Sequence, residues 1–288
     1  MATTLFIGLG RMGAPMAALH AKTFTTAVFD LSNEATAQVV EEGGAIPVTD
    51  LSSLPAGIDT VILMLPSSRQ VEDTLTGDNG LLRSLSEGTL IIDMGSSEPT
   101  STQDLARQAQ ELGVDYVDAP VSGGVPKART GELSILVGGT DEAVAKARPH
   151  LEVMGTTIIH VGNEGAGDAA KAINNLVSAT NIAVACEALT MADDFGIEPT
   201  KMAEVLNSAT GRSQASELKV TKYILPQNFT SGFAYDLMLK DMTIAMGLAH
   251  SLETPVTDVA FDKLNTGRAD LGDTPDHTEI SRLYGLDR

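Results

Sequence analysis

"LFIGLGRMGAPMAALH", residues 5–20, is the stretch that decides the fold. An apolar run is followed by glycines in a G-x-G-x-x-G arrangement, and an alanine-rich helical pattern comes next. The first glycine permits a tight turn, the second lets the backbone approach a pyrophosphate, and the third lets strand and helix pack closely, with the helix N-terminus facing the phosphates. The stretch therefore predicts a dinucleotide-binding loop rather than a glycine-rich turn without a ligand. The expected cofactor contacts are Gly8, Leu9, Gly10, Arg11, Met12 and Gly13.

Asp30 ends the next apolar run, "AVFD". It lies about twenty residues beyond the loop, where a carboxylate accepts hydrogen bonds from the ribose hydroxyls and repels a 2′-phosphate. This placement favours NAD as the cofactor. NADP stays open because Arg11 lies inside the loop and can contact an additional phosphate. The alternative for Asp30 is a structural role at the start of the following helix, "DLSNE".

Apolar, β-rich runs alternate with helical segments through the first half of the chain, which is typical of a parallel sheet covered by helices. The strand pattern stops after about Val161. The sequence predicts an α/β Rossmann domain with a mostly parallel sheet over residues 1–162 and an all-α domain over residues 163–288. The expected strands lie in "TLFIGLG", "TTAVFD", "DTVILML", "GTLIIDMG", "VDYVDAPVSGG", "LSILVGG" and "TTIIHVG". The expected helices of the second domain cover 165–195, 199–209, 213–224, 233–252, 254–265 and 276–284.

Composition restricts the class of protein and its partners. The 288 residues, 43% of them hydrophobic, suffice for two domains with a core each. The formal net charge of -19 argues against nucleic acid, whose phosphates would be repelled. It indicates a soluble surface, with adaptation to high salt as the alternative. No apolar stretch reaches the roughly eighteen residues of a membrane span, and the chain starts in a strand pattern instead of a leader, so we expect a cytoplasmic protein.

Cysteine and histidine placement gives no sign of metal or disulfide chemistry. The single cysteine, Cys186, lies in an apolar helical run and is expected to be a buried thiol. No histidine pair at helical spacing and no cysteine cluster occurs, so no metal site is predicted.

Three loops are expected to lie at the carboxyl edge of the sheet. "LPSS" (65–68) and "GSSEP" (95–99) follow strand runs and are placed to contact ribose and nicotinamide. "VDAPVSGG" (117–124) presents Ser122, Gly123 and Gly124, a hydroxyl followed by two unhindered backbone amides. Such donors suit a small carboxylate; an ordinary turn is the alternative.

"GAGDAAKAINNLV", residues 165–177, carries Lys171 and two asparagines within a small, apolar helical pattern. Helical spacing puts Lys171 and Asn175 on one face, with Asn174 beside them. The glycines at 165 and 167 allow close approach of another backbone or a ligand, and the neighbours Ala169, Ala170, Ala172 and Ile173 suggest burial. A lysine in a low-dielectric crevice has a depressed pKa and can exchange a proton with an alcohol. The alternative is a solvated surface lysine.

The chain resembles the β-hydroxyacid dehydrogenases, and within them the 3-hydroxyisobutyrate dehydrogenase branch. The resemblance rests on "FIGLGRMGAPMA", "DAPVSGGVPKARTGELSILVGG", "GAGDAAKAINN" and "FAYDLMLKDMTIAM", in the family's order and spacing. It implies that Lys171 is the catalytic acid/base with Asn175 as its partner, and that Ser122, Gly123 and Gly124 hold the substrate carboxylate. Lys240 is implied to lie near the nicotinamide and substrate. Further implied cofactor contacts are Leu65, Pro66 and Ser96, the last where many relatives carry threonine.

The resemblance implies reversible oxidation of a small, anionic 3-hydroxycarboxylate to its semialdehyde, by a homodimer or homotetramer. Asn174 stands where 6-phosphogluconate dehydrogenases carry histidine, which argues against a sugar phosphate. Lys171 argues against imine reduction. Two alternatives stay open: reduction of tartronate or succinic semialdehyde or of glyoxylate within the same family, and a non-catalytic dinucleotide-binding module.

Overall fold

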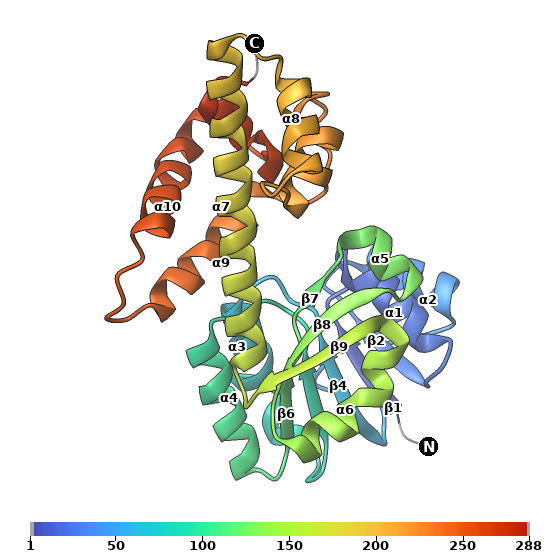
Figure 1. Ribbon diagram of the computed structural model, residues 1–288. Coiled ribbons are helices and arrows are strands. Elements are labelled where there is room, and N and C mark those ends of the chain that lie inside the picture. The colour runs from blue at the N-terminus through green and yellow to red at the C-terminus, as the bar shows by residue number, and fades with distance from the viewer. Residues whose placement is uncertain (1–2, 287–288) are drawn as a thin grey trace. The chain divides into compact units, whose positions relative to one another are not determined.

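The computed structural model describes residues 3–286 and divides the chain into two compact units, one ending at Lys171 and the other beginning at Ala172. Helix α7, Ala166–Phe195, begins in the first unit and continues into the second (Figure 1). Each unit has its own hydrophobic core, and each is described by itself.

A nine-stranded sheet forms the centre of the first unit, in the order β3-β2-β1-β4-β5-β6-β8-β7, with β9 paired to β8. Strands β1 to β6 pair in parallel, whereas β8 runs antiparallel to β6 and β7. The predicted mostly parallel sheet is confirmed. The strands are β1 (Thr3–Ile7), β2 (Thr26–Phe29), β3 (Ile46–Pro47), β4 (Ile58–Leu63), β5 (Leu90–Asp93), β6 (Asp115–Asp118), β7 (Val121–Ser122), β8 (Leu133–Gly138) and β9 (Gly155–Gly162).

Helices cover both faces of this sheet, as Figure 1 shows. In β1, Phe6 packs into one cluster with α1, α2 and α6, while Leu5 and Ile7 pack into the other with α3 and α4. This alternation follows from the two-residue period of a strand, and burial on both faces explains the continuous apolar runs. The helices are α1 (Gly13–Ala21), α2 (Asn33–Gly43), α3 (Ser68–Thr76), η1 (Leu81–Ser84), α4 (Pro99–Glu111), α5 (Gly124–Thr130) and α6 (Asp141–Met154).

The second unit is helical, as predicted. Apolar side chains of α7, η2, α9, α10 and η4 form its core, in which Cys186 is fully buried. Residues 215–224 wind as a π-helix and residues 277–284 as a 3₁₀-helix, a detail that apolar spacing does not distinguish from an α-helix. Its further elements are α8 (Pro199–Ser208), η2 (Ala215–Ile224), α9 (Tyr235–Leu248), α10 (Pro255–Gly267), η3 (Arg268–Asp270) and η4 (His277–Tyr284).

Among residues 3–286, no helix combines the length and the apolar character that crossing a membrane requires.

Candidate functional site

The glycine loop between β1 and α1 has the geometry that a pyrophosphate requires. Gly8 has a φ of +95°, and a Cβ there would lie 2.4 Å from the carbonyl oxygen of Met64. A Cβ on Gly13 would lie 1.9 Å from the carbonyl oxygen of Gly8, so the helix can pack here only without a side chain. Gly10, by contrast, is exposed and faces open space. The loop thus fits a dinucleotide phosphate approaching its backbone.

Asp30 lies directly against this loop. Its Oδ2 accepts a hydrogen bond from the Leu9 amide at 2.6 Å, and its Oδ1 accepts one from the Ser32 amide at 2.7 Å. These bonds hold the carboxylate beside the glycines, where it is placed to accept from ribose hydroxyls. The next residue in the chain is Leu31, an apolar residue that is 94% exposed. Asp30 is therefore not followed by a cation that could bind a 2′-phosphate.

The loops after β4, β5 and β6 lie at one edge of the sheet, because these strands are parallel neighbours. A Cβ on Gly95 would lie 2.9 Å from the carbonyl oxygen of Leu65, so the first two loops touch. Pro66 is exposed and Ser96 half-buried. The edge therefore brings together the residues of these two loops, Leu65, Pro66 and Ser96, that are expected to contact the cofactor.

Ser122 and the two glycines after it follow β6 at this same edge. Ser122 is half-buried, whereas Gly123 and Gly124 are exposed and have φ values of +135° and +70°. Residues other than glycine rarely adopt such backbone angles, so the chain can turn here only because neither residue carries a side chain. This arrangement suits an anionic ligand.

The start of α7 is held by Asp118 at the end of β6. Asp118 accepts from the Gly165 amide at 2.8 Å and from the Asp168 amide at 2.9 Å. A Cβ on Gly167 would lie 2.6 Å from the carbonyl oxygen of Leu136. Gly165 and Gly167 are expected from the sequence to allow close approach of another backbone segment or of a ligand. The structure shows a backbone segment at Gly167, because α7 begins against the sheet.

Asp168 adds a second buried carboxyl group, which its helical sequence context does not predict. It accepts from the Ser97 amide at 3.0 Å and from Thr102 Oγ1 at 2.7 Å. Burial raises the pKa of Asp168 well above its ordinary value, and repulsion from Asp118 and Asp93 acts in the same direction. Burial also raises the pKa of Asp118 to about 6. These carboxyl groups tie the start of α7 to the sheet edge.

Lys171 is half-buried on α7, one turn before Asn175. The expectation that its neighbours are buried is right for Ala172, which is fully buried, and wrong for Ile173, which is 49% exposed. The two asparagines also differ, since Asn175 is buried and Asn174 is exposed. Packing of α7 in the second unit thus selects Asn175 as the buried amide.

Asp241 on α9 is the partner of this amide. Asn175 Nδ2 donates to Asp241 Oδ2 at 2.6 Å, and Lys240 Nζ lies 3.3 Å from Asp241 Oδ1. The structure therefore brings together Asn175 and Lys240, two expected site residues, around a carboxylate that was not expected. A sequence signal existed: Asp241 interrupts the apolar stripe of Met238, Met242 and their neighbours on α9.

Comparison with known proteins covers both units. The NAD binding domain of 6-phosphogluconate dehydrogenase matches residues 3–162, and the NAD-binding domain of NADP-dependent 3-hydroxyisobutyrate dehydrogenase matches residues 165–284. 2-(Hydroxymethyl)glutarate dehydrogenase of Eubacterium barkeri is 41% identical, over 92% of this chain and 88% of that protein. 3-Hydroxyisobutyrate dehydrogenase of Pseudomonas aeruginosa is 37% identical over 99% of both chains. The solved structure of Mycobacterium tuberculosis 3-hydroxyisobutyrate dehydrogenase with L-serine has a TM-score of 0.90 and 31% identity, over 100% of both chains.

Proposed function

The chain belongs to the β-hydroxyacid dehydrogenase family and is an NAD(P)-dependent oxidoreductase, and from this we propose that it interconverts a small 3-hydroxycarboxylate and its semialdehyde. The proposal is supported by the compounds that appear in the names of the three similar proteins. 2-(Hydroxymethyl)glutarate, 3-hydroxyisobutyrate and L-serine all have a hydroxymethyl group on the carbon that bears a carboxylate. Only the remaining substituent on that carbon differs.

Each site residue has its own role in this reaction. The backbone amides of Gly123 and Gly124, two exposed residues, hold the substrate carboxylate together with the Ser122 hydroxyl. Asn175 orients the alcohol, and the Lys171 amine takes the hydroxyl proton as the carbon–hydrogen bond breaks. The bound nicotinamide supplies the acceptor for the hydride. In the reverse direction, Lys171 returns the proton to the oxygen of the semialdehyde.

Replacement of Lys171 tests the proposal. We expect Lys171→Ala to lower kcat by about 10²- to 10⁴-fold, because removal of a general acid/base group has this effect. The dissociation constant of the dinucleotide, measured by fluorescence titration, stays near the wild-type value. Lys201→Ala removes an exposed lysine of α8 and serves as the matched control. Turnover within about tenfold of wild type in Lys171→Ala would refute the acid/base role.

A substrate panel tests the chemical class. It contains 3-hydroxyisobutyrate, L-serine, 2-(hydroxymethyl)glutarate and a 2-hydroxycarboxylate, and in the reducing direction tartronate semialdehyde, succinic semialdehyde and glyoxylate. We expect the highest kcat/KM among compounds with a hydroxymethyl group on the carbon that bears the carboxylate, or their semialdehydes. Preference for the 2-hydroxycarboxylate would contradict the proposed substrate class, and so would the absence of turnover with every one of these compounds.

We also propose that the chain forms a homodimer or homotetramer through α7. Apolar side chains lie exposed along one face of this helix at steps of four and seven residues. They include Val184, Met191 and Phe195, which are 54%, 72% and 84% exposed. Exposed apolar side chains along one face of a helix are typical of a protein–protein contact, and a second copy of the chain supplies the same apolar stripe.

A further inference from the structure

Asp241 lies in the buried face of α9, among apolar side chains. Tyr235, Met238, Met242 and Ala245 form the remainder of that face, and Asp241 is 2% exposed. A buried carboxylate is costly unless it is paired and hydrogen-bonded. An apolar residue of the same size would fill this position at lower cost, so the value of Asp241 lies in its contacts with Asn175 and Lys240.

The contact with Asn175 determines how the amide is oriented. An ionised carboxylate only accepts hydrogen bonds, so the NH₂ end of the amide must face Asp241 Oδ2, 2.6 Å away. The other end, Asn175 Oδ1, accepts from Asn174 Nδ2 at 3.2 Å. A reversed amide would place two acceptor oxygens against each other. The carboxylate therefore selects one of the two orientations that an asparagine can adopt.

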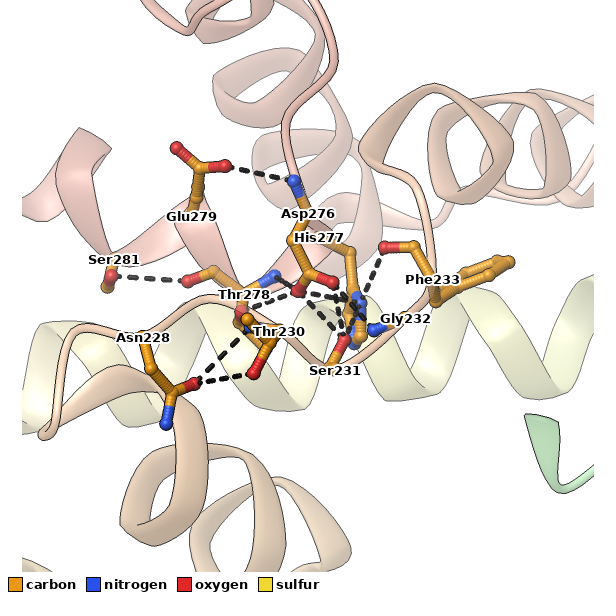
Figure 2. A network of polar contacts seen from close by, with 10 residues as sticks. All are labelled: Asn228, Thr230, Ser231, Gly232, Phe233, Asp276, His277, Thr278, Glu279 and Ser281. Atoms are coloured by element: carbon orange, nitrogen blue, oxygen red, sulfur yellow. Dashed lines mark hydrogen bonds and ion pairs between the residues drawn. The ribbon is translucent and has the colours of Figure 1, made fainter. Parts of the chain in front are cut away.

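The loop before α9 holds the helix in place. Figure 2 shows Asp276 at the centre of this loop's polar contacts, where it accepts from Ser231 Oγ at 2.8 Å and from the Gly232 amide at 2.9 Å. The first residue of α9, Tyr235, donates its amide to Pro275 and its hydroxyl to the carbonyl oxygen of Leu264, at 2.9 and 2.8 Å. With the start of α9 held at both points, Asp241 projects from a fixed element, which is what precise positioning of a neighbouring group requires.

We propose that Asp241 is a positioning residue that holds the amide of Asn175 in the orientation used in the reaction. The inference rests on the function proposed above. With one amide hydrogen committed to Asp241, Asn175 presents its Oδ1 and its second N–H to the substrate alcohol in a fixed sense. In Asp241→Asn, the new side-chain amide can present either its oxygen or its NH₂ group to Asn175. Asn175 then adopts both orientations, so the alcohol still binds but is misoriented.

A double-mutant cycle tests this role kinetically. Asp241→Asn keeps the shape of the side chain, and we expect its kcat to fall roughly 10- to 100-fold, as misplacement of a reacting group does, with KM and the dinucleotide dissociation constant within about twofold. Asn175→Ala lowers kcat by itself. In the double variant, Asp241→Asn adds no further loss, because the group it positions is gone. Asp236→Asn, the same change at an exposed carboxylate of α9, leaves kcat unchanged.

A spectroscopic readout tests the hydrogen bond without turnover. The side-chain NH₂ signals of Asn175, identified by their absence in Asn175→Ala, are expected downfield in the ¹⁵N-correlated NMR spectrum because one hydrogen binds a carboxylate. In Asp241→Asn that signal moves upfield, and in Asp236→Asn it stays in place. Thermal unfolding of all variants shows whether each retains its fold.

The outcomes separate this inference from the proposed function. Losses that multiply in the double variant would overturn the positioning role and assign Asp241 an effect of its own. An unchanged Asn175 signal in Asp241→Asn would also overturn it. Wild-type turnover in Asn175→Ala would overturn both the role of Asn175 in the proposed function and this inference.

Discussion

At the scale of a single residue, the carboxylate of Asp30 is expected to determine the preference between NAD and NADP. We propose that it makes the enzyme prefer NAD, because it stands beside the glycine loop and would repel a 2′-phosphate. Asp30→Ala is expected to lower kcat/KM with NAD and raise the ratio of the NADP to the NAD value by at least about tenfold, which corresponds to one charge-assisted hydrogen bond. Steady-state kinetics with both cofactors measures the ratio.

The comparison of two cofactors also corrects for a structural effect of this substitution. Asp30 accepts the Leu9 amide, so its removal loosens the loop and weakens both dinucleotides. That loss cancels in the ratio. Asp50→Ala, at an exposed carboxylate of the same unit, is the control. An unchanged ratio in Asp30→Ala would show that another residue selects the cofactor.

At the scale of an element, the first turn of α7 is expected to make stability depend on pH. The folded-state pKa of Asp118 and Asp168 is raised by burial, so the folded state holds protons that the unfolded state releases. Their stabilising effect is complete below the unfolded pKa, about 3.9, and is lost as the pH rises through the folded values, which for Asp118 is about 6. Asp168→Asn imitates the protonated carboxyl group at every pH.

We therefore expect Asp168→Asn to raise the free energy of unfolding at pH 8, by about 1–2 kcal/mol, and to change it less at pH 4.5. Urea denaturation at both pH values measures the difference. Burial lowers the pKa of His20 to about 3, so the pH dependence of its contribution to stability has the opposite sign. The stability that neutral His20 provides is lost as the pH falls from 6.5 toward 3. Because the variant retains His20, that contribution cancels. Asp104→Asn, exposed on α4, is the control, and an equal effect of Asp168→Asn at both pH values would contradict the prediction.

At the scale of the whole molecule, the apolar stripe of α7 coexists with a net charge of -19. Val184→Glu with Met191→Glu is expected to convert the proposed oligomer to monomer, because burying two unpaired carboxylates costs several kcal/mol. Light scattering after size-exclusion chromatography measures the mass. Raising the salt concentration should strengthen association of the wild type, since it screens repulsion between the acidic chains.

Leu112→Glu is the matched control for the oligomer prediction, since it adds the same charge at an apolar residue of the first unit that is 45% exposed. It is expected to leave the mass unchanged. A wild-type chain that is monomeric at every salt concentration would contradict the proposal. An oligomer that persists in the Val184→Glu, Met191→Glu variant would place the interface elsewhere.

The sequence by itself determined the fold class and the order of its parts. Apolar spacing, the glycines at 8, 10 and 13 and the position of Asp30 are local features, and local geometry dictates what they form. Only the tertiary structure decided that Asp118 holds the start of α7 and that Asp241 faces Asn175. By pattern alone, an aspartate in a helix is expected at the surface. Its burial depends on which distant segment packs against it, and that information is absent from the spacing of its neighbours.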